Sequence, residues 1–385
     1  MQKDFHYYAT YCAAYLAGYS HDECLDICYS AQFVDLCTRN FLSSVGGPMA
    51  AATTQTQMEL ANADTTPVGL RDITRIWASF HFLPGDLYAD KAHCSKRYLR
   101  KYRMICNPDS DLLLDTVELA KGGSLQAVGI AMHVLADTWA HRYFAGTPSL
   151  VINNTNRYFT ELMPDGEERE VSFRHSPGAP DDPENGIYTN SLNQGKEDSI
   201  MNLGHGRAGH LPDYSFIRYK YLSSWGDYEE TVKDNPHDYL QAFAQMIRAM
   251  RYLRGEIDVF EKETYDFDIV EPYRERIETI LRKRQLDACE DWRRLGEELS
   301  GQEIPEYDTD RYREEYRQAA EEDRDGTFLG KFFVGALAQK SMVTGKIYES
   351  GSKLAGYAVD YQKKGFRGIR DFEKLLHYLR GEADE

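Results

Sequence analysis

The sequence predicts a mainly α-helical protein: a multi-helix bundle with a long irregular insertion and a helical C-terminal extension. Apolar residues recur at helical spacing through most of the 385 residues and make up 42% of the chain. The segment 146–215 instead alternates short apolar pieces with clusters of Pro, Gly, Asn and Asp, as in SPGAPDDPENG, which predicts irregular structure with a hairpin at most. We expect a helical metal-binding domain over 1–225, which includes the insertion, and a helical C-terminal region over 226–385.

The N-terminal part is expected to form helices up to the insertion. Residues 4–18 are rich in Ala and Tyr with no breaker before Gly18, and residues 21–42 place apolar side chains at helical spacing. Pro84-Gly85 ends an amphipathic segment, and Gly122-Gly123 separates the last two helices. The expected helices are 4–18, 21–42, 49–63, 70–82, 111–121 and 124–145.

Charged amphipathic segments resume after the insertion. A Gly- and Ala-rich apolar stretch, residues 332–359, either packs closely against other helices or lies on a membrane surface. Packing is favoured because interfacial helices usually carry bulkier aromatic residues and a more basic polar face. The helices expected in this part are 238–262, 270–299, 308–322 and 367–380.

The charge of the chain limits its partners. A formal net charge of −17 argues against a broad groove for nucleic acid, so no stable nucleic-acid partner is expected, although a bound metal supplies positive charge locally. No window approaches the roughly 18 apolar residues that span a bilayer. Asp4 and His6 interrupt the N-terminal segment where a signal peptide needs an apolar run, which predicts a cytoplasmic protein. The oligomeric state is left open.

The seven cysteines are odd in number and lack paired CxxC spacing. We interpret them as buried free thiols in a reducing compartment. Cys24 and Cys28, four residues apart on a predicted helix, are the alternative metal-binding pair.

The chemistry is concentrated in AVGIAMHVLADTWAHRYFAG. His133, Asp137 and His141 recur every four residues there, so all three project from one face of a helix. Apolar neighbours predict that this helix is buried, where titratable groups need mutual pairing, hydrogen bonds or a metal. A hydrogen-bonded His-Asp-His string is the structural alternative. Imidazole nitrogens and carboxylate oxygens are the ligands that zinc favours outside cysteine sites, which indicates a metal site.

Three further polar residues lie among apolar or aromatic neighbours on other predicted elements, namely His6, Asp35 and His81. Taken singly, each has a structural explanation, as a core histidine or as a helix cap. Together with the central helix they form a ligand set drawn from four elements, which is how helical bundles build metal sites.

The order His6, Asp35, His81 and His133-x3-Asp137 resembles the zinc-dependent phospholipase C and P1 nuclease superfamily over residues 1–215. Members share an all-helical fold in which three zinc ions hydrolyse phosphoesters. The resemblance implies that Asp35, His81 and His133 bind one zinc, that Asp137 bridges to a neighbouring ion and that His6 helps to hold that ion. The N-terminal region, with YSAQFVD and AMHVLADTWAHRYFAG, is also similar to an uncharacterised bacterial family of unknown function.

The sequence departs from the superfamily at three points. His141 follows Asp137 after three residues instead of five, and the superfamily's His-x3-Glu is absent. Members also bind zinc through the amino group of an N-terminal Trp, whereas this chain begins at Met1, for which we expect no such role. Two ions, zinc or another divalent metal, are therefore expected instead of three.

The best substitute for the missing element is GHGRAGHLPDYSF, where His205, His210 and Asp213 lie within nine residues. Its three glycines permit the positive φ that a ligand loop needs. We expect this loop, residues 204–214, to provide the ligands of a second metal. The alternative is a glycine-rich turn with surface histidines.

These features predict a zinc-dependent hydrolase that acts on a phosphoester, phospholipid or nucleotide-like substrate, the partner being a phosphate-containing small molecule or lipid. Bound zinc lowers the pKa of its water from about 15.7 toward about 7, so no protein nucleophile is needed. Asp35 or Asp213 is the candidate catalytic base, and Arg142 or Arg207 the candidate phosphate ligand.

Two other classes of function are considered. In the first, the metal staples the helices without catalysis and the protein serves as a binding or interaction module. The second is a His-Asp phosphohydrolase, which needs a contiguous His-Asp pair. It is disfavoured because the pairs present, His21-Asp22 and His237-Asp238, lie in polar surroundings.

Overall fold

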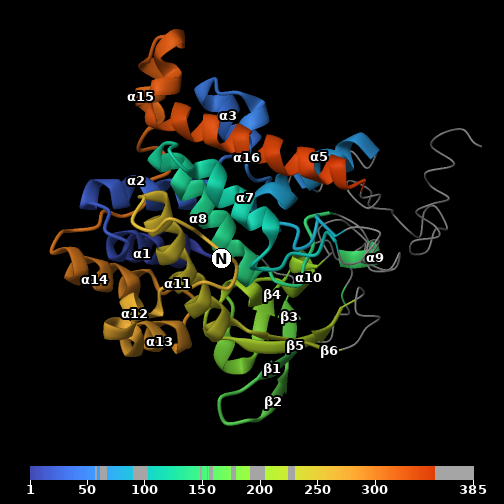
Figure 1. Ribbon diagram of the computed structural model, residues 1–385. Helices are drawn as coiled ribbons and strands as arrows, with labels where there is room; N and C mark the ends of the chain where they lie inside the picture. The colour runs from blue at the N-terminus through green and yellow to red at the C-terminus, as the bar shows by residue number, and fades with distance from the viewer. Residues whose placement is uncertain are drawn as a thin grey trace, which may run out of the picture.

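The computed structural model describes residues 1–56, 59–60, 67–89, 103–147, 150–153, 155, 159–174, 179–190, 204–223 and 230–351. The chain is mainly helical, as predicted, and carries a small β-sheet at one end of the helices (Figure 1). The helix predicted over 367–380 lies outside the described residues, as does most of the second half of the one predicted over 49–63.

The centre of the bundle is α8 (Leu125–Ala140), which begins where the Ser124 side chain accepts a hydrogen bond from the backbone of Ala127. Its residues are buried almost throughout, because helices surround it. Gly129 allows the closest of these contacts, since a Cβ there would lie 2.4 Å from the carbonyl oxygen of Ile27. The helices packed around α8 are α2 (His21–Phe33), α5 (Pro67–Phe80), α7 (Asp111–Ala120), α11 (Asn235–Leu253) and α16 (Phe328–Ser350).

The N-terminal segment begins as a π-helix, η1 (Asp4–Ala9), and continues as α1 (Thr10–Leu16). A reciprocal capping box between Ser20 and Glu23 starts α2. The helix predicted over 21–42 is broken, because Thr38 caps a new helix, α3 (Arg39–Val45), after a turn. The short 3-10 helix η2 (Met49–Ala51) follows.

Shorter helices connect α11 to α16 in the C-terminal part. Lys283 adopts an extended conformation at the end of α13, so the helix predicted over 270–299 is interrupted. α16 covers most of the Gly- and Ala-rich stretch and packs against α5 and α8, as the packing interpretation predicted. The connecting elements are α12 (Phe267–Val270), η6 (Glu271–Tyr273), α13 (Arg274–Arg282), α14 (Cys289–Ser300), α15 (Arg313–Gln318) and η7 (Glu321–Gly326).

The segment predicted to be irregular with a hairpin at most contributes most of the strands, among them one antiparallel pair of consecutive strands. Strands of three to five residues form an antiparallel sheet in the order β2-β1-β5-β6, and β3 pairs in parallel with β4. Such short strands leave little alternating pattern in the sequence. The elements are α9 (Leu150–Asn153), β1 (Thr160–Leu162), β2 (Glu168–Glu170), β3 (Ser172–Arg174), η3 (Pro183–Asn185), β4 (Ile187–Thr189), α10 (His205–Ala208), η5 (Leu211–Asp213), β5 (Arg218–Leu222) and β6 (Glu230–Asp234).

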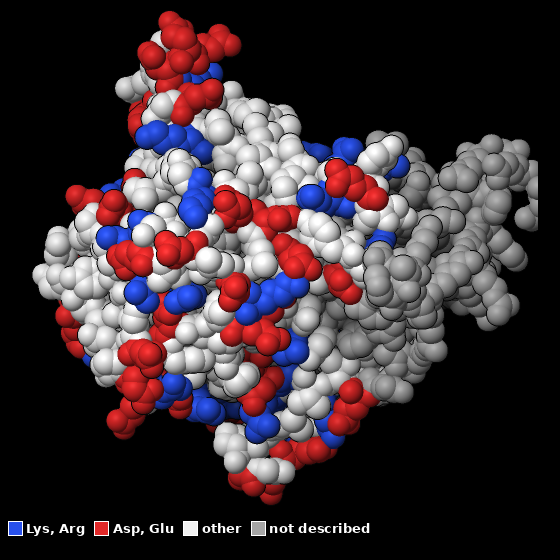
Figure 2. Space-filling view, in the orientation of Figure 1, with Lys and Arg blue, Asp and Glu red and all other residues white. Residues whose placement is uncertain are grey.

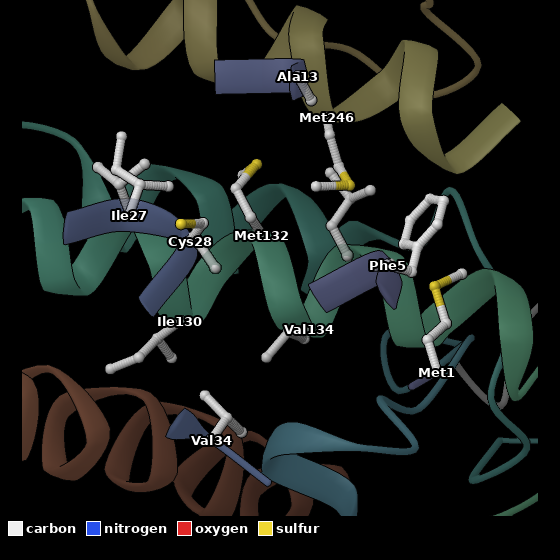
Figure 3. Packing of buried hydrophobic residues seen from close by; sticks show 14 of the residues in the cluster. Met1, Phe5, Ala13, Ile27, Cys28, Val34, Ile130, Met132, Val134 and Met246 are labelled. Carbon is white, nitrogen blue, oxygen red and sulfur yellow. The ribbon is translucent and has the colours of Figure 1, made fainter. Parts of the chain in front are cut away.

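One apolar cluster joins helices from both predicted ranges, 1–225 and 226–385. Val134 of α8, Met246 of α11 and Phe332 of α16 all belong to it, and Figure 3 shows part of this packing around α8. A second, aromatic cluster lies between the sheet and the end of α8. Of the cysteines that the structure describes, all are free thiols, and five of these six are buried.

The surface carries mixed charge. On the face drawn in Figure 2, basic and acidic side chains are interspersed, and acidic residues gather near α15. Within the described part of the chain, none of the helices combines the length and apolar character needed to cross a membrane.

Candidate metal centre

α8 brings three of the predicted ligands together. His133, Asp137 and His141 are exposed by only 0%, 1% and 5%, which confirms that this face of the helix is buried. His133 Nε2 lies 3.2 Å from Asp137 Oδ2, and His141 Nδ1 lies 3.5 Å from the same oxygen. The helix ends at Ala140, so His141 occupies its C-cap position. The four-residue spacing therefore produces the common face that it predicted.

Backbone carbonyls hold three histidines by one ring nitrogen each. His133 Nδ1 lies 2.9 Å from the carbonyl of Ala31, and His141 Nδ1 lies 2.7 Å from that of His81. His81 Nε2 lies 3.0 Å from the carbonyl of Thr53. A carbonyl only accepts, so each of these nitrogens carries the proton, and in a neutral ring the opposite nitrogen presents a lone pair. Metal-binding histidines are oriented in this way.

The first group of donor atoms gathers around Asp137 Oδ2. His81 Nδ1 and His133 Nε2 each lie 3.2 Å from this oxygen and 3.3 Å from one another. Asp35 Oδ1 lies 3.8 Å from His81 Nδ1 and 3.9 Å from His133 Nε2. Asp35 follows α2 and His81 follows α5, so three separate elements meet at α8. The ligand atoms of Asp35, His81 and His133 all lie within 4.8 Å of one another, as a metal site requires.

His6 reaches the same region from η1. Its ring stacks on that of His133 with centroids 3.9 Å apart, and its Nε2 lies 3.2 Å from Asp137 Oδ1. His6 is fully buried, yet neither ring nitrogen forms a hydrogen bond. Such unsatisfied buried donors and acceptors are costly, so this ring is placed for a partner that the protein itself does not provide. π-helical turns of this kind are frequent at functional sites.

The second group gathers around Asp213 at the end of η5. His141 Nε2 and His205 Nε2 each lie 3.3 Å from Asp213 Oδ1. These three residues form a further set whose ligand atoms lie within 4.8 Å of one another. His210 is placed differently: its side chain is 56% exposed, and its Nδ1 lies 3.4 Å from Asp213 Oδ2, the oxygen that faces away from the group. Two of the three ligands predicted in the loop 204–214, His205 and Asp213, therefore lie in the centre. The third, His210, contacts the centre only through Asp213, at its edge.

Two glycines shape this segment as the sequence analysis predicted. Gly204 and Gly209 flank α10 with φ of +50° and +61°, in the left-handed region that other residues disfavour. A Cβ on Gly209 would also lie 2.1 Å from the carbonyl oxygen of Thr189. The loop expected from the sequence is a short helix followed by a 3-10 turn, which fixes His205 and Asp213 on ordered backbone.

The amino group of Met1 lies inside the centre, a position that the sequence did not predict, and the expectation that it binds no metal stays a prediction. Its nitrogen lies 2.8 Å from Asp137 Oδ1, 3.3 Å from Asp213 Oδ1 and 3.4 Å from His141 Nε2. Figure 1 marks the N-terminus in the middle of the molecule, near α8, α11 and the sheet. A backbone amine leaves no residue-type signal from which this position could be predicted. Its one indication was the position of Met1 a few residues before His6.

Comparison with known proteins places the chain among its relatives. The model of the family of unknown function DUF6765 matches residues 1–347. The chain belongs to the DUF6765 family. This confirms the expected similarity to an uncharacterised family. No curated protein and no solved structure matches the chain, so the resemblance to the phospholipase C and P1 nuclease superfamily rests on the ligand residues alone.

In the centre of this DUF6765 member, burial and the neighbouring charges decide which groups are ionised. Burial raises the pKa of Asp137 and Asp213, but the surrounding histidines and the Met1 amino group outweigh it and hold both pKa values well below the usual range. Burial lowers the pKa of His6 and His141 to about 4, so both rings are neutral near pH 7. Neutral imidazole beside ionised carboxylate is the protonation state that binds metals.

The amino group provides the opposite charge. Burial lowers the pKa of the Met1 amine, but Asp137, Asp213 and Asp35 outweigh burial and raise it to about 11. The metal-free chain therefore holds its own ammonium ion between the carboxylates. A metal that bound through this nitrogen would have to displace the proton.

The spacing of the donor atoms fits a metal ion of the size of zinc. Ligands about 2.0–2.1 Å from a tetrahedral zinc stand about 3.3–3.4 Å apart. Asp213 Oδ1 lies 3.3 Å from His141 Nε2, His205 Nε2 and the Met1 nitrogen, and Met1 lies 3.4 Å from His141. In the first group, the distances of 3.2 and 3.3 Å between two histidine nitrogens and Asp137 Oδ2 fall in the same range. Asp35 Oδ1 stands farther from the two histidine nitrogens, at 3.8 and 3.9 Å.

Two residues of the groups are partly exposed to solvent. The side chains of Asp35 and His205 are 29% and 23% exposed, whereas those of the other residues in the two groups are exposed by 11% or less. The guanidinium of Arg142 already has protein partners: its Nε donates to Asn107 Oδ1 at 3.1 Å, and its Nη1 lies 4.0 Å from Asp238 Oδ1. Arg207 lies on α10, two residues after His205.

Proposed function

We propose that this protein binds two zinc ions that share Asp137 and hydrolyses phosphoesters. The observation that carries the proposal is the convergence of histidine nitrogens and carboxylate oxygens from several elements in one buried volume. His81, His133 and His141 each direct one ring nitrogen to a carbonyl, so the opposite nitrogens face the oxygens of Asp137 and Asp213 and are oriented to bind a cation together with them.

Two ions are the smallest number that uses both groups. The first is held by Asp35, His81, His133 and Asp137 Oδ2, with His6 beside it. The second is held by Met1, His141, His205 and Asp213. Asp137 Oδ1 faces His6 and Met1, so this one carboxylate reaches both positions. His133 offers one nitrogen to this group, and one nitrogen binds one ion. The first group is therefore counted as a single metal position and not as two.

The bound ions supply Lewis acidity to a phosphoryl oxygen and acidity to water. The remaining chemistry belongs to the chain. Asp35 is the better candidate base of the two predicted, because its carboxylate is partly exposed and able to accept a proton from water. Asp213 is nine-tenths buried and surrounded by Met1, His141, His205 and His210, so it is committed to binding.

A metal that only staples the helices is the second candidate, and the near-complete burial of Asp137 and His133 favours it. A structural zinc has a closed shell of protein ligands, whereas a catalytic zinc keeps an open position. The exposure of Asp35 and His205 favours an accessible centre. Activity measurements on metal-loaded protein separate the two.

The test is elemental analysis of the purified protein combined with hydrolysis of generic phosphomonoesters and phosphodiesters. We expect two zinc equivalents per chain and metal-dependent hydrolysis. Asp137→Asn should lower both metal content and activity, the latter by at least about 100-fold, because it removes the shared carboxylate. Asp72→Asn, which alters an exposed ion pair with Arg75, is the control and should change neither. Absence of stoichiometric metal after reconstitution, or wild-type hydrolysis by Asp137→Asn, would refute the proposal.

A further inference from the structure

Thr53 joins two of the proposed ligands of the first ion. Its hydroxyl donates to the carbonyl of Val34 at 2.6 Å, and its own carbonyl accepts the Nε2–H of His81 at 3.0 Å. Val34 directly precedes Asp35, so Thr53 contacts both the peptide group that leads into one ligand and the ring of the other. Thr53 is fully buried, so water does not replace either contact when it is lost.

Both ligands lie just beyond the ends of helices. α2 ends at Phe33 and α5 at Phe80, and Asp35 and His81 occupy the turns that follow. A regular ladder of helical hydrogen bonds does not continue into these turns. The Oδ1 of Asp35 and the Nδ1 of His81 stand 3.8 Å apart, and this separation depends on contacts with other segments. Thr53 provides a contact to both.

The backbone around Thr53 is irregular, which makes its carbonyl available. Residues 52–56 form neither helix nor strand, although the sequence predicted a helix over 49–63. In a helix, this carbonyl would accept a hydrogen bond from the backbone of the fourth residue after it. Here it accepts from the ring of His81, while the backbone nitrogen of Thr53 donates to the carbonyl of Cys37 at 3.0 Å. Tertiary contacts therefore place this segment.

Lys340 of α16 holds the same segment from another helix. Its ammonium donates to the carbonyl of Ala50 at 2.6 Å and to that of Ala52, the residue before Thr53. The same ammonium lies 5.8 Å from the ring centroid of Phe80, the last residue of α5, and α16 packs beside α5 (Figure 1). A side chain of the C-terminal part of the chain thus fixes the residues that lead into Thr53.

We propose that Thr53 is a positioning residue of the first metal position. Its hydroxyl and its carbonyl hold Asp35 and His81 within reach of one ion, and Lys340 holds Thr53 in place. Without the hydroxyl, the turn that carries Asp35 loses its contact with the segment that orients His81, and the first ion binds more weakly. The inference rests on the proposed metal centre and assigns to it a residue that contacts neither metal nor substrate.

The experiment measures metal binding by Thr53→Val and Thr53→Ser. Valine has the shape of threonine without the hydroxyl, whereas serine keeps the hydroxyl. Each variant is also made in a His205→Ala background, which lacks a ligand of the second group and therefore reports on the first position. Zinc titration against a chelating dye gives the affinity, and the absorption spectrum of bound Co²⁺ reports the geometry of the ligands. Thermal unfolding establishes that each protein is folded.

Thr116→Val is the matched control for the loss of a buried hydroxyl. Thr116 is 1% exposed, and its hydroxyl donates to the carbonyl of Leu112 at 2.9 Å. Both residues belong to α7, which carries none of the proposed ligands. We expect this variant to lose stability to a similar extent as Thr53→Val, because each leaves a buried carbonyl without its donor, and to bind both ions as the wild type does.

We expect Thr53→Val to weaken binding at the first position by about 10- to 100-fold and to change the cobalt spectrum, while the second equivalent is retained. Thr53→Ser should keep the affinity and the spectrum of the wild type. If Thr53→Val does not fold, Lys340→Met decides, because it removes the contacts from α16 and should show the same selective loss.

A folded Thr53→Val protein with wild-type affinity and an unchanged spectrum would overturn the inference. Thr53→Ser that binds as weakly as Thr53→Val would also overturn it, because the hydroxyl would then not be the cause. A wild-type protein without metal would refute the proposed centre and this inference together. Two metal equivalents without hydrolysis would refute the proposed reaction alone, and the affinities would still decide the role of Thr53.

Discussion

At the scale of single residues, the centre depends on which nitrogen of each histidine carries the proton. The sequence predicts that His133 and His141 lie on one buried face, but it carries no sign of the carbonyls of Ala31 and His81 that orient them. Those acceptors come from α2 and from the residue that follows α5, at sequence separations of 102 and 60 residues. The ligand types were therefore predictable, and their tautomers were not.

Acid should destabilise the metal-free protein through His6 and His141. Burial lowers their folded-state pKa from 6.5 to about 4, with the charge of His133 adding to the effect on His6. Between these values the unfolded chain binds more protons than the folded one, so stability is complete above pH 6.5 and is lost as the pH falls toward 4. The loss is of the order of 3 kcal/mol per histidine at most.

Urea unfolding of the metal-free protein at about pH 7 and about pH 5 measures this loss. His6→Gln should be less sensitive to acid than the wild type, because it removes one of the two groups. Equal stability of the wild type at both pH values would contradict the assignment of neutral, buried rings.

At the scale of elements, the site depends on how closely α2 approaches α8. Gly129→Ala should destabilise the protein by about 1–3 kcal/mol, because the new methyl group would lie 2.4 Å from the carbonyl oxygen of Ile27 and 2.6 Å from the Cβ of Ser30. It should also weaken metal binding, since the next residue of α2, Ala31, orients His133.

The matched control is Gly345→Ala in α16, where no atom lies within 4 Å of the added methyl group. That variant should be stabilised by up to about 1 kcal/mol, because Ala is the better helix former. Denaturation midpoints of both variants give the comparison. Similar effects of the two substitutions would mean that the α2–α8 contact adapts to the extra volume.

At the scale of the whole molecule, the predicted boundary at residue 225 lies between β5 and β6, which are paired neighbours in the sheet. Helices α11 and α16, from beyond this boundary, pack directly on α8. We expect a fragment of residues 1–225 to be insoluble or unfolded, because it loses one strand of that pair and two helices that cover the core.

Solubility, circular dichroism and metal content of the fragment 1–225 test this expectation against the full-length protein. A soluble fragment that unfolds cooperatively and retains metal would show that the C-terminal helices form an appendage. That result would support the division into two regions that the sequence analysis predicted.

The sequence by itself determined the class of the fold and the core of the ligand set. His133, Asp137 and His141 share a face because the helical period is a local property of the backbone, and the apolar residues around them predict burial. Only the tertiary structure decided that the two oxygens of Asp137 face different groups of donors, and that the amine of Met1 lies 2.8 Å from one of them across 136 residues of chain. Such convergence follows from the packing of distant segments against α8, which no local pattern encodes.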